Sequence, residues 1–130
     1  MSYYFNKILS SGSFEEAIQR VSDELQKEGF AVITEIDVTK IFKEKINVDF
    51  KKYRILGACN PHFAHQALLS EDKVGLFLPC NIVVQENENG QIEIAAVDPI
   101  ASMMSVENDN LEEFGLTVRE KMMQIIDNLD

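Results

Sequence analysis

Apolar residues recur along this chain with two spacings, one typical of helices and one typical of strands. The clearest helical spacing follows Ser13, which can form a capping box with Glu16, and Gly29 predicts the end of that helix. A capping box at Asp109 and Glu112 predicts a second helix of about 20 residues near the end of the chain. Each helix has one apolar stripe, so each needs a surface to pack against.

Five shorter runs are rich in β-branched and aromatic residues, and turn-forming residues separate them, so we predict five strands. Asn89 and Gly90 lie between the last two runs and predict a hairpin. Pro79 interrupts the fourth run, and because proline cannot donate to a sheet ladder, we expect a bulge or an edge position there. The predicted strands are residues 3–9, 30–36, 53–59, 74–85 and 92–96.

Two short helices are predicted between the strands. Asp37 can cap one that starts at Val38 and ends near Lys45. Asn60 followed by Pro61 is a strong start signal for the other, because asparagine accepts from free N–H groups and proline has no N–H to leave unpaired. The whole order is strand, helix, four strands with short helical insertions, and a long final helix.

This order predicts a single α+β domain, residues 1–130, in which two main helices cover one face of a mostly antiparallel sheet. The arrangement strand, helix, four strands, helix is that of helix-grip and TATA-binding-protein-like folds. A ferredoxin-like sandwich is the alternative, if the segment between Cys59 and Val74 is a parallel crossover.

The charge of the chain is strongly negative but unevenly distributed. The 22 acidic and 12 basic residues give a formal charge of -10, which argues against nucleic-acid or membrane partners because their phosphates are also negative. Residues 40–54 hold half of the basic side chains and are locally +4, so the remainder is -14. This window is either a solvated surface, a site for a small anion, or the cationic half of a self-complementary interface.

Length and composition indicate in which cellular compartment we expect the protein. A 130-residue chain buries roughly two thirds of its unfolded surface, so it needs no disulfide or structural metal to fold. No apolar run approaches the roughly 18 residues of a membrane span, and the first residues lack the basic start and apolar stretch of a signal peptide. We therefore expect a cytoplasmic protein.

The candidate site comes from one repeated pair of residue types, Cys59-Asn60 and Cys80-Asn81. Cys59 precedes a predicted helix start, where the helix dipole favours the thiolate, and Cys80 follows the expected bulge. The two thiols could form a reversible disulfide or half of a soft-metal site, or they could simply be packed. The amides of Asn60 and Asn81 could orient a ligand in a shared pocket or satisfy local backbone groups.

No complete catalytic or metal-binding set is visible. His62 and His65 would complete a Cys₂His₂ set for zinc, but the spacing is not a recognised ligand pattern. A nucleophile built from Cys59, His62 and Asp98 needs a base within hydrogen-bonding reach, and Met103 with Met104 is better explained as packing than as a thioether site. Phosphate-binding, dinucleotide-binding and hydrolase motifs are all missing from the sequence, so we assign no cofactor and no catalytic residue, and we favour a protein that is not an enzyme.

Three stretches of fixed spacing carry a resemblance to a known family. They run from Tyr53 to Leu68 (YRILGACNPxxAxxAL), from Val74 to Val84 (VGxxLPCNIVV) and from Val97 to Pro99 (VDP). Together they resemble the domain-of-unknown-function family numbered 302 (DUF302). The resemblance implies a small α+β fold, commonly met as a homodimer, and brings no established activity. The matching positions are Gly57, Cys59, Asn60, Pro61, Ala64, Leu68, Gly75, Pro79, Cys80, Asn81, Asp98 and Pro99.

Two functional hypotheses follow from these observations. The first is a small dimeric module that binds either a protein partner or a ligand, which could be a small molecule or an anion. Its site would lie at Cys59, Asn60, Cys80 and Asn81. The alternative is a thiol-dependent redox or soft-metal-handling protein that uses Cys59 and Cys80.

Overall fold

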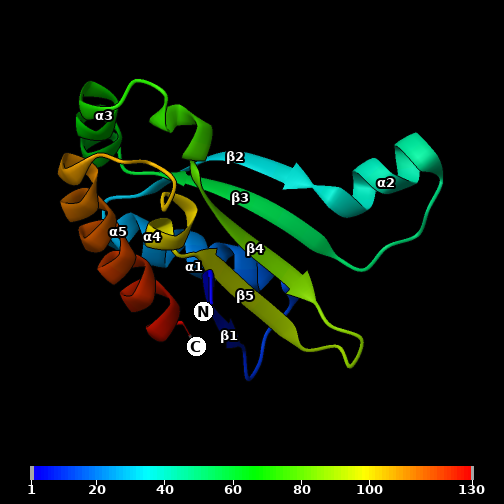
Figure 1. Cartoon of the computed structure of the whole chain (residues 1–130). Helices are drawn as coiled ribbons and strands as arrows, with labels where there is room; N and C mark the ends of the chain where they lie inside the picture. The colour runs from blue at the N-terminus through cyan, green and yellow to red at the C-terminus, as the bar shows by residue number, and fades with distance from the viewer. Residues whose placement is uncertain (1, 130) are drawn as a thin grey trace.

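The computed structural model describes residues 2–129, which form one five-stranded antiparallel sheet with helices around it (Figure 1). The order of strands across the sheet is β1-β5-β4-β3-β2, so the first strand pairs with the last. The α+β class predicted from the sequence is confirmed. The strands are β1 (Tyr4–Ile8), β2 (Ala31–Asp37), β3 (Tyr53–Cys59), β4 (Cys80–Glu86) and β5 (Ile92–Val97).

The helices occupy the expected places in the order, with two additions. The short helix α4 and the 3₁₀ helix η1 were not predicted. β3 and β4 pair antiparallel on either side of α3, so the segment between them is no parallel crossover and the ferredoxin-like alternative is wrong. The helices are α1 (Phe14–Lys27), α2 (Val38–Ile46), α3 (Pro61–Ser70), η1 (Val74–Phe77), α4 (Pro99–Ser102) and α5 (Asp109–Asp127).

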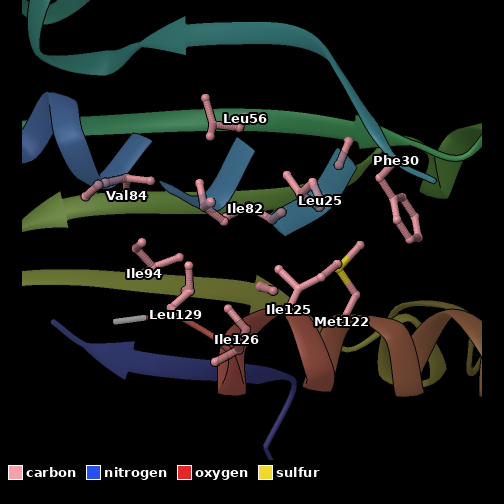
Figure 2. Close-up of a cluster of buried hydrophobic side chains, with 14 of the residues drawn as sticks. Leu25, Phe30, Leu56, Ile82, Val84, Ile94, Met122, Ile125, Ile126 and Leu129 are labelled. Carbon is pink, nitrogen blue, oxygen red and sulfur yellow. The ribbon is translucent and has the colours of Figure 1, made fainter. Parts of the chain in front are cut away.

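One face of the sheet carries the hydrophobic core. Helices α1 and α5 contribute their apolar stripes, and every second residue of the central strands points toward them (Figure 2). A buried leucine or isoleucine side chain stabilises the fold by roughly 1.5–3 kcal/mol, so this layer supplies most of the driving force for folding. Its fully buried members include Val21, Leu25, Leu56, Ile82, Val84, Ile94, Met122 and Ile125.

The helix boundaries test the sequence signals directly. At α1 the capping box is formed as predicted: the Ser13 side chain accepts from the Glu16 N–H, and the Glu16 carboxylate accepts from the Ser13 N–H. At α5 the expected capping box at Asp109 is wrong by one residue. Asn108 is the N-cap and accepts from the Asn110 N–H. The asparagine amide oxygen reaches the first turn from there, so Asp109 becomes the first helical residue.

The long fourth strand predicted from residue 74 begins only at Cys80. Residues Val74–Phe77 form η1 instead, and a cis peptide bond joins Leu78 to Pro79. The ladder with β3 starts after the proline, which has no N–H to donate to it. The register irregularity of the sheet lies in β2, between Val32 and Thr34, rather than at Pro79.

The second face of the sheet has no helix packed on it in the described part of the chain (Figure 1). Its residues face one another across all four ladders, as the strand registers show. We call this surface the open face. It consists of Tyr4, Asn6, Ile8, Thr34, Ile36, Tyr53, Ile55, Gly57, Asn81, Val83, Gln85, Glu93, Ala95 and Val97.

Residues 38–52 form an arm that extends beyond the ends of β2 and β3 (Figure 1). It contains α2 and the segment that leads back into β3. The helix is capped by the Asp37 side chain, which accepts from the Lys40 N–H, and it ends at Asn47 in a left-handed conformation. None of the α2 residues is buried. The arm is therefore ordered locally without contributing to the core.

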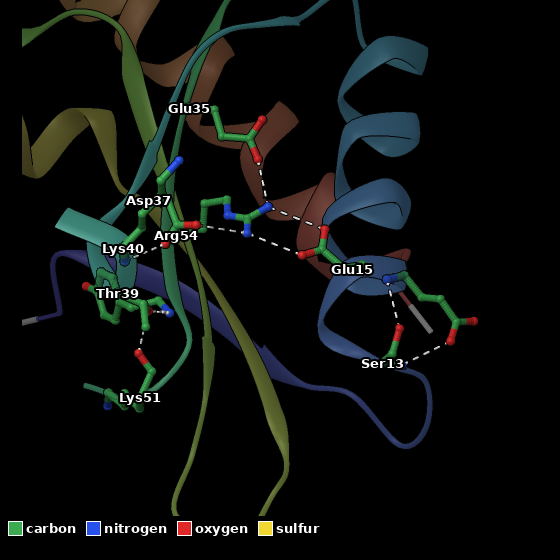
Figure 3. Close-up of polar contacts among 10 residues, drawn as sticks. Ser13, Glu15, Glu35, Asp37, Thr39, Lys40, Lys51 and Arg54 are labelled. Carbon is green, nitrogen blue, oxygen red and sulfur yellow. Dashed lines mark hydrogen bonds and ion pairs between the residues drawn. The ribbon is translucent and has the colours of Figure 1, made fainter. Parts of the chain in front are cut away.

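Arg54 ties α1 to the strands at the base of the arm (Figure 3). Its guanidinium lies 3.2 Å from Glu15 on α1, 3.0 Å from Glu35 and 3.4 Å from Asp37 on β2. The guanidinium also lies over the Phe14 ring, 5.4 Å from its centroid. Sequence reasoning assigned Arg54 only to the basic window, yet it shares the phase of buried Leu56 along β3, which is a signal that it points to the covered side.

Candidate functional site

An apolar cavity of about 50 Å³ lies where the ends of β3 and β4 meet α3, α4 and α5. Such a volume exceeds the roughly 10–15 Å³ needed for one water molecule. The lining of the cavity is almost entirely hydrocarbon. The lining residues are Phe30, Ala58, Cys59, Asn60, Phe63, Ala64, Ala67, Val74, Phe77, Leu78, Pro79, Cys80, Pro99, Ser102, Met103, Leu111, Phe114 and Val118.

The walls of the cavity come from segments far apart in the sequence. The small residues Ala64 and Ala67 of α3 leave space that larger side chains would fill. Ala67 also forms a second apolar cluster with Val74 and Leu111, which line the same cavity. This cluster joins η1 to α5. The cavity thus exists because three helical segments close over the strand ends, which no local sequence pattern announces.

Two of the candidate site residues, Cys59 and Cys80, line this cavity as free thiols. Cys80 pairs in register with Ala58, so the two cysteines are offset by one position on neighbouring strands and form no disulfide. Burial, with a smaller contribution from Cys59, raises the pKa of the Cys80 thiol to about 11 from its ordinary value of 9.0. Cys80 is therefore protonated at neutral pH, while Cys59 is partly exposed at the end of β3.

The two asparagines occupy different surroundings. Asn60 lines the cavity and is also the N-cap of α3, where its side-chain oxygen accepts from the Phe63 N–H at 3.4 Å. Asn81 is exposed and belongs to the open face, where it lines a hollow that does not include the cysteines. Cys59, Asn60 and Cys80 therefore each contribute to the lining of one cavity, whereas Asn81 lies on the other side of the sheet.

The histidines lie outside this site. His62 and His65 are exposed on α3 and do not line the cavity. Within residues 2–129 no group of three or more histidine, cysteine or acidic side chains could hold a metal ion. The Cys₂His₂ possibility therefore has no geometric basis in this fold.

Asp98 has a structural task beside the cavity. Its side chain is buried, accepts from the Ile100 N–H at the start of α4, and pairs with Arg119 of α5 at 3.2 Å. The Arg119 guanidinium in turn lies over the Phe5 ring of β1. Asp98 is thus engaged with a helix start and a cation, and it fixes α4 against α5 as one wall of the cavity. The two partners are 21 positions apart in the chain, so no local sequence pattern indicates this pair.

The open face has a shallow hollow of its own, with a volume of about 410 Å³. It is lined by aromatic and small apolar side chains together with a few amides. Glu93 is the one charged residue among those that define the open face, and amide groups of Asn6, Gln85 and Asn87 donate to its carboxylate. The residues that line the hollow are Tyr3, Tyr4, Tyr53, Asn81, Val83, Gln85, Glu93, Ala95, Ala96 and Val97.

None of the helices in residues 2–129 is long and apolar enough to span a bilayer.

A search among curated proteins finds no match. The crystal structure of an uncharacterized conserved DUF302 protein from Bacillus stearothermophilus superposes on the whole chain with a TM-score of 0.91, covers 100% of both chains and shares 28% of its residues. The family model for the domain of unknown function DUF302 matches residues 6–129. The chain therefore belongs to the DUF302 family, as its sequence motifs suggested.

Proposed function

We propose that this protein is a small ligand-binding module whose site is the cavity at Cys59, Asn60 and Cys80. The observation that carries the proposal is the cavity itself, a space of about 50 Å³ lined by hydrocarbon in an otherwise well-packed domain. Packed interiors contain few voids larger than a water molecule, and unfilled apolar space costs stability. A ligand that fills it gains contacts that no protein side chain makes.

The lining favours a small, mainly apolar ligand, or the apolar end of a larger one. Asn60 and Ser102 are the polar side chains in the lining besides the two thiols. Few polar groups converge there, so shape and burial, rather than charge, would select the ligand. Cys59 would lie beside a bound ligand, so binding would change the surroundings of its thiol. Free thiols also fit a reducing compartment such as the cytoplasm.

Xenon is a suitable probe, because it binds dry apolar cavities without needing a polar partner. We expect methyl NMR signals of Ala58, Ala67 and Val74 to shift as xenon pressure rises. Ala67→Leu should abolish these shifts by filling the space, and Ala64→Leu serves if that variant does not fold. Leu69→Ala, which changes an exposed side chain of the same helix, is the matched control and should keep them. Absent shifts, or shifts spread over the surface, would contradict the proposal.

We also propose that the module works as a homodimer. The open face supports this, because it exposes apolar side chains such as Tyr4, Ile8 and Ile36, and contiguous exposed apolar patches usually mark interaction sites. Sedimentation velocity over a range of protein concentrations tests it. A chain that stays monomeric at the highest concentration would contradict the dimer and leave the cavity proposal standing.

A further inference from the structure

The arm carries several apolar side chains that are exposed to solvent. Its exposed apolar residues are Ile41, Ile46, Val48 and Phe50, of which Ile46 is 63% exposed. A nine-residue helix is marginal in water without a packing surface, because isolated helices shorter than about 12–15 residues barely form. The arm therefore has the composition of a segment that packs on something outside its own domain.

The apolar surface of the arm is continuous with the open face. Phe42 of α2 packs edge-on against Phe50 with ring centroids 5.2 Å apart, and Phe50 lies 6.1 Å from Tyr53. Tyr53 in turn lines the hollow of the open face. One aromatic row thus connects the projecting helix to the sheet surface, and a partner covering one would meet the other.

The charges of the two parts have opposite sign. The arm holds five lysines and two acidic residues, a formal +3 on a chain of -10, so the rest of the molecule is -13. Two whole copies repel at long range, but the arm of each is attracted to the body of the other. A two-fold axis satisfies this attraction twice, since each arm then meets the partner's body in the same way.

We propose that the arm packs on the open face of a second copy of this chain, so that two copies exchange arms around a two-fold axis. This inference rests on the homodimer proposed above and specifies its interface. The apolar side of the arm would cover the partner's hollow around Val83 and Ala95, where amide groups donate to the Glu93 carboxylate and offset part of the cost of covering it. The lysines would remain at the rim, facing the partner's acidic surface.

Sedimentation velocity of the full chain and of two single variants tests the interface. Ile46→Glu in the arm and Val83→Asp on the open face should each raise the dimer dissociation constant by roughly tenfold or more, because each buries a charge at the proposed contact. Leu69→Glu is the matched control, since Leu69 is a more exposed apolar residue on α3, away from both surfaces. Its dissociation constant should equal that of the wild type. Circular dichroism confirms that the variants remain folded.

The dependence of dimerisation on salt concentration tests the electrostatic part of the proposal. Lys43→Glu combined with Lys45→Glu should weaken the dimer at low ionic strength and have little effect near 1 M salt, where charges more than about 3 Å apart are screened. A monomeric wild type would overturn both the dimer and the arm exchange. A dimer that Ile46→Glu and Val83→Asp leave unchanged, or that Leu69→Glu disrupts, would overturn the arm exchange alone.

Discussion

The two faces of this sheet share the same strands and differ in almost everything else. The covered face is packed with fully buried aliphatic side chains from two helices, whereas the open face mixes tyrosines, amides and small apolar residues. Neighbouring residues of one strand belong to opposite faces, so Val84 is completely buried and Val83 is not. The packing that stabilises the fold therefore lies on one face, which leaves the other free to acquire a binding role.

The same truncation made on the two faces should have very different effects on stability. Val84→Ala should lower the free energy of unfolding by about 2–3 kcal/mol, because it removes two buried methyl groups and leaves a cavity. Val83→Ala should cost less than about 1 kcal/mol in dilute solution. Urea unfolding of both variants measures the difference. Equal losses would mean that the open face is as tightly packed as the core.

A glycine marks where the open face tolerates no added bulk. A Cβ atom on Gly57 would clash with Thr34 and lie only 2.7 Å from the Pro79 ring, while one on Gly75 would have ordinary contacts. We expect Gly57→Ala to destabilise the fold by about 1–3 kcal/mol through overpacking. Gly75→Ala is the control and should stay within about 0.5 kcal/mol of the wild type. Thermal unfolding compares the two, and an unchanged Gly57→Ala variant would show that the strands can separate locally.

The Cys80 thiol makes the covered side sensitive to alkaline pH. Its folded-state pKa of about 11 lies above the ordinary 9.0, so the unfolded chain loses this proton first as the pH rises. The stabilisation is therefore complete below pH 9 and disappears between pH 9 and pH 11, with a loss of about 1 kcal/mol by pH 10. Denaturant unfolding at pH 8 and pH 10 checks this against Cys80→Ala, which should lack that part of the pH dependence. At neutral pH a thiol reagent should label Cys59 in the native protein and Cys80 only after unfolding.

The smallest expected effect sharpens the contrast between the core and the arm. The Thr39 hydroxyl donates to the Lys51 carbonyl at 2.6 Å and accepts from the Tyr53 N–H, which closes the base of the arm. Thr39→Ala should change global stability by less than about 0.5 kcal/mol, because the arm adds nothing to the core. Amide hydrogen exchange should nevertheless speed up in α2 and not in α1. Loss of α1 protection would show that the arm and the core unfold together.

Much of the fold follows from local signals in the sequence. The Ser13 capping box, the Asn60-Pro61 helix start and the Gly90 turn act within a few residues of chain, so their outcome depends little on distant packing. The segment before Cys80 was misassigned for the opposite reason. Val74 is apolar because it packs into the second cluster, beside the cavity, and burial in a 3₁₀ turn has the same apolar signature as burial in a strand.

The candidate site was predictable only in part. Cys80 and Asn81 are adjacent residues of one strand, and strand alternation alone separates them onto opposite faces. Cys59 and Asn60 escape that rule because β3 ends at Cys59 and Asn60 already caps α3. The cavity that collects Cys59, Asn60 and Cys80 needs the packing of α3, α4 and α5 over the sheet, and that information lies in pairs such as Asp98 and Arg119, far apart in the sequence.

The pairing of β1 with β5 also limits how early the sheet can be completed during synthesis. The first strand has no ladder partner until residues 92–97 exist, and the Lys7 ammonium binds the carbonyl oxygens of Asp127 and Leu129 at the far end of α5. During synthesis, therefore, β1 stays unpaired until the ribosome has added most of the chain. Such non-local contacts slow folding, because a long loop must close before they form. A chain that stops before residue 92 therefore leaves β1 without its ladder partner.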